Sequence, residues 1–426
     1  MPDRLTVRTV PVADPGGLLP SLPHPAALAW IRRGEGLAGW GEAARLTLPA
    51  GEDRFTAAEK QLRELFDGSR VADDVQVPGS GPVAFGSFTF DAASDGSVLV
   101  IPRAVLGRRA GTAWLTTITD GDEPLPAAVP VSAPAQVRWS DGSLAAPQWE
   151  QAVAAAVARI RAGGLRKVVL ARDLHAAAGQ DIDVRLVLAR LAARYPDCYT
   201  FSCAGLVGAT PELLIRRDGS EVRSLVLAGT TRRGGTAAED VQLGVALLAS
   251  AKNIEEHSYA VADVQSALAP LCAELDVAPR PSLLRLANVQ HLATLVRGRL
   301  QAAADPATGV SGPPADPADP AAGVPASLAL AGALHPTAAV CGTPAGPAME
   351  LIRELEEMDR GRYAGPVGWI DARGNGEWGI ALRCAELDGP RARLFAGCGI
   401  VADSDPAAEL AEAQTKFRPV QEALEG

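Results

Sequence analysis

The sequence lacks three features that mark other classes of protein: paired cysteines, an excess of basic residues and long hydrophobic runs. Its six cysteines are scattered without a C-x-x-C pair, which argues against a disulfide framework or a zinc site and predicts reduced, buried thiols. The formal net charge of -10 at pH 7 argues against a nucleic-acid partner, because phosphate binding needs a basic face. An acidic chain can still bind an anionic substrate if arginines or a metal ion reverse the sign locally.

No run approaches the roughly eighteen apolar residues that a membrane span needs. The start, Met-Pro-Asp-Arg, has neither the basic region nor the apolar region of a secretory signal. We therefore expect a cytoplasmic protein with no membrane partner. Its 426 residues and 47% hydrophobic content allow a large core, either in one α/β unit or in several domains.

The chain changes character along its length. Residues 1 to about 115 contain short alternating apolar runs separated by Gly or Asp-Gly, which predict antiparallel sheet. Residues 119 to 148 are rich in Pro, Ala, Ser and Asp and predict a crossing loop. From Trp149, helical spacing stops at Gly-Gly and is followed by the β-branched strand RKVVLARDL. Residues 238 to 275 have apolar residues at three- and four-residue spacing, which predict one or two helices.

A literal G-x-G-x-x-G at Gly374, Gly376 and Gly379 raises the question of a nucleotide loop. In a dinucleotide-binding loop the glycines follow a strand and open a helix. Here Asn375-Gly376 is a typical hairpin-turn pair, and the alternation from Trp378 to Cys384 predicts a strand with one core face. The motif is therefore not interpreted as a nucleotide loop.

The residues after this motif could bind an anion. Small residues surround Arg383, which could hold a carboxylate bidentately or simply lie in solvent. Gly397 and Gly399 in RARLFAGCGI predict close backbone approach and free N–H groups. Asp405 and Pro406 then predict the start of a helix.

Two predicted helices carry carboxylates at short spacing. Glu409, Glu412 and Lys416 share one face of the last helix, and Asn253 and Glu256 lie three residues apart on the central helix. Such oxygen ligands could share a hard cation such as Mg²⁺. Alternatively, each glutamate lies on a solvated helix face, with a salt bridge between Glu412 and Lys416.

Lys167 opens the strand KVVLAR and is a candidate general base. Burial would disfavour its charged form, whereas the alternative is a strand-end lysine that reaches water. Glu212, after the Thr-Pro of GATPELL, is a candidate partner acid or an ordinary turn glutamate. His257 and His291 have apolar neighbours and are interpreted as core or supporting groups rather than as metal ligands.

Ten ordered segments resemble the chorismate-utilising enzymes, and most of all isochorismate synthase. The resemblance covers about residues 145 to 420, and the segments are KVVLAR, GATPELL, LVLAGTTRRG, KNIEEH, NVQHL, LHPTAAVCGTP, RYAGPVGW, GNGEWGIALRCAEL, LFAGCGIV and AAELAEAQTK. It implies an α/β (α+β) fold in which two antiparallel sheets, flanked by helices, enclose a deep pocket. It also implies a Mg²⁺-dependent reaction on chorismate.

The resemblance implies a role for each matching residue. Lys167 would activate water for attack at C2, and Glu212 would protonate the departing C4 hydroxyl. Asn253 stands where the family often has an acid, so its role stays open. The remaining residues would hold Mg²⁺ (Glu256, Glu409, Glu412), bind the enolpyruvyl carboxylate (Tyr363, Arg383, Gly397, with Lys416 and Gly399 nearby) or line the ring (Gly229, Thr230, His291).

The choice of family member depends on a few residues. Anthranilate synthase and aminodeoxychorismate synthase use ammonia or a covalent lysine in the loop that corresponds to LAGT, whereas this chain has Ala228 there and a lysine at 167, which favours water. Salicylate synthase uses the same water chemistry and then eliminates pyruvate. HPTAAV, with the small Ala339, and GNGEW favour isochorismate synthase. A dinucleotide-binding oxidoreductase and a catalytically silent relative stay open.

We expect one integrated unit made of a mainly β half (1–140) and a chorismate-binding catalytic half (141–426). The low-complexity segment 301–327 is interpreted as a mobile insertion outside the chemistry. We expect no glutamine amidotransferase subunit, and a monomer or weak homodimer. The pathway served, for menaquinone, a siderophore or another product, stays open.

Overall fold

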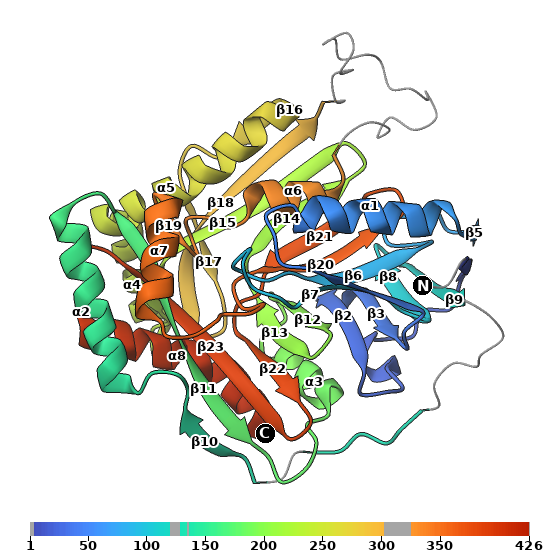
Figure 1. Cartoon of the computed structure of the whole chain (residues 1–426), viewed down its shortest axis with the longest axis horizontal. Helices are drawn as coiled ribbons and strands as arrows, with labels where there is room; N and C mark the ends of the chain where they lie inside the picture. The colour runs from blue at the N-terminus through green and yellow to red at the C-terminus, as the bar shows by residue number, and fades with distance from the viewer. Residues whose placement is uncertain (1–3, 120–127, 134–135, 302–324, 426) are drawn as a thin grey trace.

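The structure is a computed structural model, and it describes residues 4–119, 128–133, 136–301 and 325–425. Its strands form two large sheets of 13 and 10 strands, with helices packed around them (Figure 1). Nearly all neighbouring strands are antiparallel, and the pair β1–β5 is parallel. This architecture confirms the predicted α/β class with two antiparallel sheets.

The first sheet contains strands from both ends of the sequence. Its order is β10 (Arg138–Asp141), β11 (Lys167–Ala177), β23 (Arg391–Ile400), β22 (Cys384–Asp388), β13 (Leu206–Thr210), β12 (Tyr199–Cys203), β2 (Ala27–Arg32), β3 (Glu35–Trp40), β8 (Ala104–Arg109), β9 (Thr112–Thr119), β1 (Thr6–Pro11) and β5 (Arg70–Asp73), with β19 (Gly342–Thr343) beside β11.

The second sheet also mixes early and late strands. Its order is β16 (Cys272–Val277), β18 (Val289–Leu300), β15 (Glu221–Arg232), β14 (Leu213–Asp218), β21 (Gly376–Ile380), β20 (Pro366–Asp371), β6 (Val83–Ser87), β7 (Ser97–Ile101) and β4 (Ala44–Leu48), with β17 (Ser282–Arg285) beside β18.

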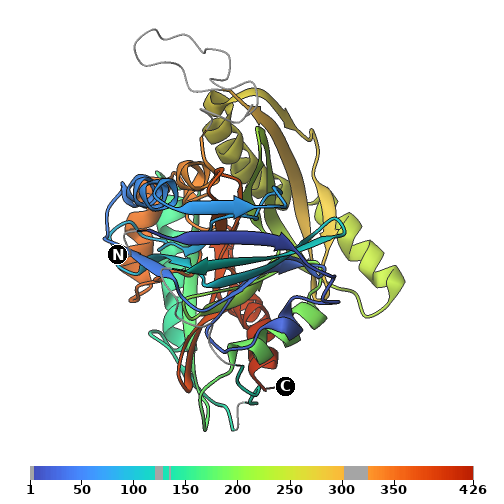
Figure 2. The same cartoon turned by 90° about the vertical axis from the view of Figure 1, so that its right-hand side faces the viewer.

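Eight α-helices and two short 3-10 helices surround the sheets in the described part of the chain. Helix α5 packs on β15 and β18, whereas α8 packs on β23 and contacts α2 and α3. Figures 1 and 2 both show α4 and α5 on the side away from the blue N-terminal strands. The helices are α1 (Arg54–Asp67), α2 (Ala146–Ala162), α3 (Val184–Arg194), α4 (Ala237–Ala249), α5 (Ala251–Leu268), α6 (Ser327–Leu334), α7 (Ala345–Leu355), α8 (Pro406–Glu425), η1 (Leu19–Ser21) and η2 (Ala269–Leu271).

Several local predictions are confirmed. Helix α2 ends before Gly163 and Gly164, both of which have positive φ, and β11 follows. Residues 238–275 contain the two helices α4 and α5. At the start of α8, the backbone N–H of Ala408 donates to Oδ1 of Asp405 at 2.8 Å. All six cysteines are buried and free.

The glycine motif lies in a hairpin, as predicted, but the turn ends one residue earlier than the predicted pair Asn375-Gly376. Strands β20 and β21 pair around it, Gly374 takes the positive φ of +77°, and Gly376 is already the first residue of β21. Asn375 is buried, and its side chain contacts Asp371 and the backbone of Gly219. Since no helix begins directly after these three glycines, this cluster gives no support to the dinucleotide-binding alternative.

The mainly β half also contains one helix that was not predicted, α1, which buries Phe55, Leu62 and Phe66 at helical spacing. Two expectations were wrong. The crossing loop contains β10, although its residues 120–127 and 134–135 lie outside the described residues. The predicted strand from Trp378 to Cys384 is two strands in different sheets. Gly397 and Gly399 lie inside β23, opposite β11, and the close approach predicted for them brings Gly397 near Tyr363 and Gly399 near Lys167 and Glu256.

The predicted insertion 301–327 falls mostly on residues 302–324, which lie outside the described residues. Its last residue, Ser327, begins α6. Among the residues that the structure describes, none of the helices combines the length and the apolar character that a membrane crossing requires.

Candidate active site

One cavity of about 140 Å³ lies between the two sheets and is bordered by α5 and α8. A single water needs roughly 10–15 Å³ of such space, so the cavity has room for a small organic molecule. The structure brings all 13 predicted site residues to its walls: Lys167, Glu212, Gly229, Thr230, Glu256, His291, Tyr363, Arg383, Gly397, Gly399, Glu409, Glu412 and Lys416.

Lys167 and Glu256 form a buried ion pair on one wall. The Nζ of Lys167 lies 2.8 Å from Oε1 of Glu256, and the lysine side chain is 2% exposed. The water-exposed alternative for this lysine is therefore wrong. Gly399 packs against the pair, because a Cβ at this position would lie 2.9 Å from Oε1 of Glu256 and 3.0 Å from Cε of Lys167.

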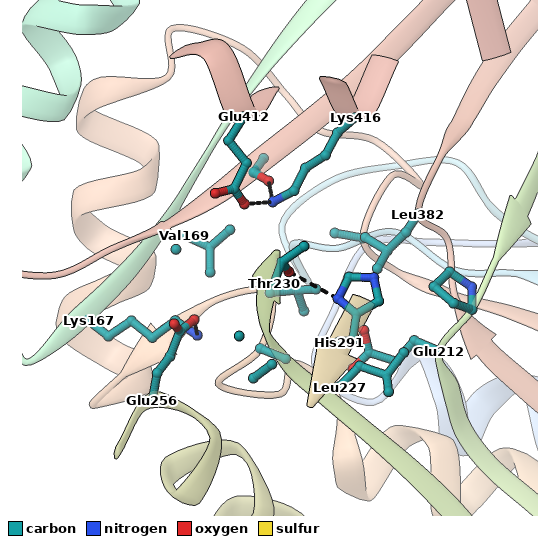
Figure 3. Close-up of a pocket in the computed structure, with 18 of the residues that line it drawn as sticks. Lys167, Val169, Glu212, Leu227, Thr230, Glu256, His291, Leu382, Glu412 and Lys416 are labelled. Atoms are coloured by element: carbon teal, nitrogen blue, oxygen red, sulfur yellow. Dashed lines mark hydrogen bonds and ion pairs between the residues drawn. The ribbon is translucent and has the colours of Figure 1, made fainter. Parts of the chain in front are cut away.

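Glu212 lies across the cavity from Lys167 (Figure 3). It occupies the point where the chain leaves β13 in the first sheet and enters β14 in the second. Burial raises the pKa of Glu212 to about 8, although Lys167, Arg383 and the backbone N–H of Leu227 pull it down. The carboxyl group therefore carries a proton at neutral pH and can donate it.

His291 and Thr230 form a neutral polar pair on the wall near Glu212 (Figure 3). Oγ1 of Thr230 and Nδ1 of His291 are 3.0 Å apart. Burial lowers the pKa of His291 to about 3, so the ring is neutral. Its buried Nε2 has no hydrogen-bond partner among the described residues. Gly229, at a bulge of β15, has a positive φ of +74° and brings the backbone close to Asn253.

Helix α8 supplies a second ion pair. Nζ of Lys416 lies 2.6 Å from Oε1 of Glu412 and donates to the carbonyl oxygen of Gly397 at 2.7 Å. The lysine lowers the pKa of Glu412 and keeps that carboxylate charged. One turn earlier, burial raises the pKa of Glu409.

Two acidic side chains of α8 offer oxygen ligands for a hard cation. Cys398, Glu409 and Glu412 place ligand atoms within 4.8 Å of one another. Burial raises the pKa of the Cys398 thiol, and sulfur is a soft ligand, whereas carboxylate oxygens are the ligands that Mg²⁺ prefers. The third predicted ligand, Glu256, belongs to the pair with Lys167 on another wall.

Tyr363 and Arg383 complete the polar lining. Tyr363 is buried and stacks on Phe395 with ring centroids 5.1 Å apart. A Cβ on Gly397 would lie 3.0 Å from the Tyr363 hydroxyl, so this glycine leaves room for that group. Arg383 takes the left-handed φ of 49° between β21 and β22, and within the described residues its side chain makes no hydrogen bond or ion pair.

The cavity also has walls that the sequence interpretation did not identify. Lys252, Val169, Val340 and Arg360 line it without having been singled out. The helical spacing of KNIEEH places Lys252 one turn before Glu256, which was a usable signal. No sequence signal identified Arg360, because a buried arginine in a turn is indistinguishable in sequence from an exposed one.

Comparisons with known proteins agree with this geometry. The family described as chorismate binding enzyme matches residues 25–422. A salicylate biosynthesis isochorismate synthase of Pseudomonas aeruginosa is 44% identical over 281 residues, which are 65% of this chain and 54% of that protein. Isochorismate synthase DhbC of Bacillus subtilis is 38% identical over 287 residues, which are 65% of this chain and 67% of that protein.

A solved structure has the same overall fold. The structure of MenF, the menaquinone-specific isochorismate synthase of Escherichia coli, matches with a TM-score of 0.77 and 25% sequence identity. The match covers 99% of this chain and 94% of that one. The chain thus spans about half the length of the Pseudomonas relative and nearly all of this solved chain.

Proposed function

Because the chain belongs to the family of chorismate binding enzymes, we propose that it is an isochorismate synthase, an isomerase that converts chorismate to isochorismate. One observation carries the proposal. A buried, protonated Glu212 faces Lys167 across a single cavity that is large enough for a small anion. Such a pair can remove a proton from one reacting group and supply a proton to another.

The reaction exchanges one hydroxyl group for another. Lys167 takes a proton from a water molecule as the water oxygen bonds to C2 of the ring. The double bonds shift, the bond between C4 and its hydroxyl oxygen breaks, and Glu212 gives its proton to the departing oxygen, which leaves as water. Lys167 must be neutral at this point, so its ion pair with Glu256 has to be released first. The proton then returns from Lys167 to Glu212 through solvent.

Other residues hold the substrate in position. Arg383, Lys416 and Tyr363 would bind the enolpyruvyl carboxylate together with the backbone of Gly397, because a guanidinium and an ammonium suit that anion. Thr230 and His291, with Gly229, would line the ring. Fixed orientation of water, base and acid around one ring accounts for a large part of the barrier reduction in such reactions.

The donor set of α8 supports a Mg²⁺ requirement. Glu409 and Glu412 would hold the ion, with Glu256 as the third ligand. When bound, Mg²⁺ would neutralise the ring carboxylate and stabilise the negative charge that develops on it. The alternative product, salicylate, would need the same cavity and a further elimination of pyruvate.

The proposal has consequences for partners. A water nucleophile needs no ammonia-supplying subunit, so we propose a cytoplasmic monomer or weak homodimer that acts without a glutamine amidotransferase. We also propose that the two halves of the chain act as one unit, since strands of both halves share each sheet.

Product analysis tests the proposed function. Purified protein incubated with chorismate and Mg²⁺ should form isochorismate, detected by chromatography, without free pyruvate. Stoichiometric pyruvate release would replace the assignment with salicylate synthase. Chorismate binding without turnover would refute a catalytic role altogether.

A further inference from the structure

A further buried ion pair, Glu356 with Arg360, lies behind the wall that carries Lys167. Their side chains are 1% and 2% exposed, and Nε of Arg360 donates to Oε2 of Glu356 at 2.9 Å. Glu356 follows the last residue of α7, and Arg360 lies four residues later, where it also borders the cavity. The proposed reaction gives neither residue a role.

The pair occupies a gap along one edge of β11. The other edge of β11 pairs with β23 from Val168 to Ala177. On the edge in question, β19 pairs at its start, through Val168, and β10 pairs from Leu174 onward. Between these two strands, a buried edge still has backbone groups that need partners.

Glu356 and Arg360 satisfy these backbone groups as a neighbouring strand would. The N–H of Ala171 donates to Oε1 of Glu356 at 2.7 Å. The carbonyl oxygen of Val169 accepts from Nη2 of Arg360 at 2.8 Å. The strand that begins with Lys167 is therefore held on this edge by two charged side chains.

The same arginine reaches two other walls of the cavity. Its Nη1 donates to the carbonyl oxygen of Val340 at 2.9 Å, beside Ala339. Its own carbonyl oxygen accepts from the N–H of Tyr363 at 3.1 Å. The guanidinium thus links β11 to the segment before β19, while the backbone carbonyl of the same residue accepts within the turn that carries Tyr363. The planar fork of the guanidinium fixes the directions of its own bonds, which the single ammonium of a lysine cannot reproduce.

We propose that Glu356 and Arg360 are positioning residues, which hold the strand of Lys167 and the turn of Tyr363 in register around the substrate. The inference rests on the proposed function for its activity readout. Stability alone is a weaker explanation for the pair, because well-packed apolar residues often replace buried ion pairs at no cost in stability. Displacing a catalytic group by about 1 Å can slow a reaction roughly 100-fold.

The test compares Arg360→Lys with Arg185→Lys. Arg185 is a matched control, because it also forms a buried ion pair, with Asp183 at 2.6 Å, and also donates to backbone carbonyls, those of Pro23, Val129 and Pro130. It does not border the cavity. For each variant, kcat and KM for chorismate are measured together with the amide hydrogen exchange of every segment.

We expect Arg360→Lys to lower kcat roughly 10- to 100-fold and to speed exchange at residues 169–171. Arg185→Lys should lower the melting temperature by a similar amount but leave kcat unchanged. An Arg360→Lys enzyme with wild-type kcat and KM would overturn the proposal, as would equal losses of kcat in both variants. If Arg360→Lys does not fold, Glu356→Gln, which keeps an acceptor for Ala171, is compared in its place.

The two readouts separate this proposal from the proposed function. Exchange at residues 169–171 is measured without substrate, so unchanged exchange in Arg360→Lys refutes the link to β11 whatever the enzyme catalyses. If the wild-type protein does not turn over chorismate, the proposed function fails. The positioning role in that reaction then fails as well, even if the exchange measurement shows that Arg360 holds β11.

Discussion

Replacing Glu212 by glutamine should inactivate the protein and at the same time make it more stable near neutral pH. The glutamine keeps the shape of the side chain but has no acidic proton to give to the departing hydroxyl. Loss of a general acid typically costs roughly 10²- to 10⁴-fold in rate. We therefore expect kcat for chorismate to fall by at least 100-fold, with a much smaller change in KM.

The gain in stability follows from the pKa of Glu212, which burial raises from 4.5 to about 8. Between these two values the unfolded chain loses the proton while the folded chain keeps it, so stability that is fully present below pH 4.5 declines up to about pH 8. At pH 7 the solution is 7 − 4.5 = 2.5 pH units above the ordinary pKa. At 1.36 kcal/mol per unit, the free energy of unfolding is then lower by about 3 kcal/mol than below pH 4.5. Glu212→Gln removes this loss.

Thermal or denaturant unfolding from pH 4 to 9 measures the effect. The stability difference between Glu212→Gln and wild type should be near zero at pH 4 and should grow toward pH 8. In wild type, kcat should decline above about pH 8, as the acid loses its proton. Glu221→Gln, at an exposed position of β15, is the matched control and should change neither property. A Glu212→Gln protein with wild-type kcat, or with a pH-independent stability difference, would refute the reasoning.

Four further predictions concern the opposite wall and the cation. Lys167→Ala should abolish turnover in a protein with a native circular dichroism spectrum, and an active variant would contradict the base assignment. Gly399→Ala should lower kcat at least several-fold, because its Cβ would displace Lys167 or Glu256; Gly346→Ala, whose Cβ meets nothing within 4 Å, should be silent. Chelation by EDTA should stop turnover and Mg²⁺ should restore it. Calorimetry should show Mg²⁺ binding to Glu412→Gln weakened by at least roughly 10-fold, because even the loss of a group that only orients a metal ligand costs roughly 10- to 100-fold in affinity. Unchanged binding would remove Glu412 from the ligand set.

Local chemistry made some elements predictable from sequence. The helix α2 and the strand β11 are separated by Gly163 and Gly164, and the start of α8 is fixed by Asp405 and Pro406. In each case the residue that ends or starts the element acts on its own backbone, so no distant contact is needed to recognise it.

Other features depend on partners that are far away in sequence. Helix α1 was missed because strand-like segments surround it, although its apolar spacing is helical. The two charged residues behind β11, Glu356 and Arg360, were missed because their partners are backbone groups of a strand nearly 200 positions earlier. A sequence pattern gives the type of each residue but not the distant backbone groups that its side chain will contact.

The position of Arg383 shows why the site itself is difficult to derive from alternation. β21 belongs to the second sheet and β22 to the first, yet apolar residues alternate through both. The period of two is a property of each strand and says nothing about which sheet the next strand joins. The chain changes sheets at residues 381–383, where the left-handed backbone of Arg383 breaks the alternation.

Glu212 lies at a second crossover of the same kind, from β13 in the first sheet to β14 in the second. Because β13 pairs with β22 and β14 pairs with β21, the two crossovers lie side by side. The N–H of Ala209 donates to the carbonyl oxygen of Arg383 at 3.2 Å, and that of Ile380 donates to the carbonyl oxygen of Glu212 at 3.4 Å. A crossover residue is free from the alternating in-and-out geometry of a strand, so its side chain can point into the space between the sheets. The pairing of these four strands, which no local pattern specifies, therefore brings the protonated carboxyl of Glu212 and the guanidinium of Arg383 to one cavity.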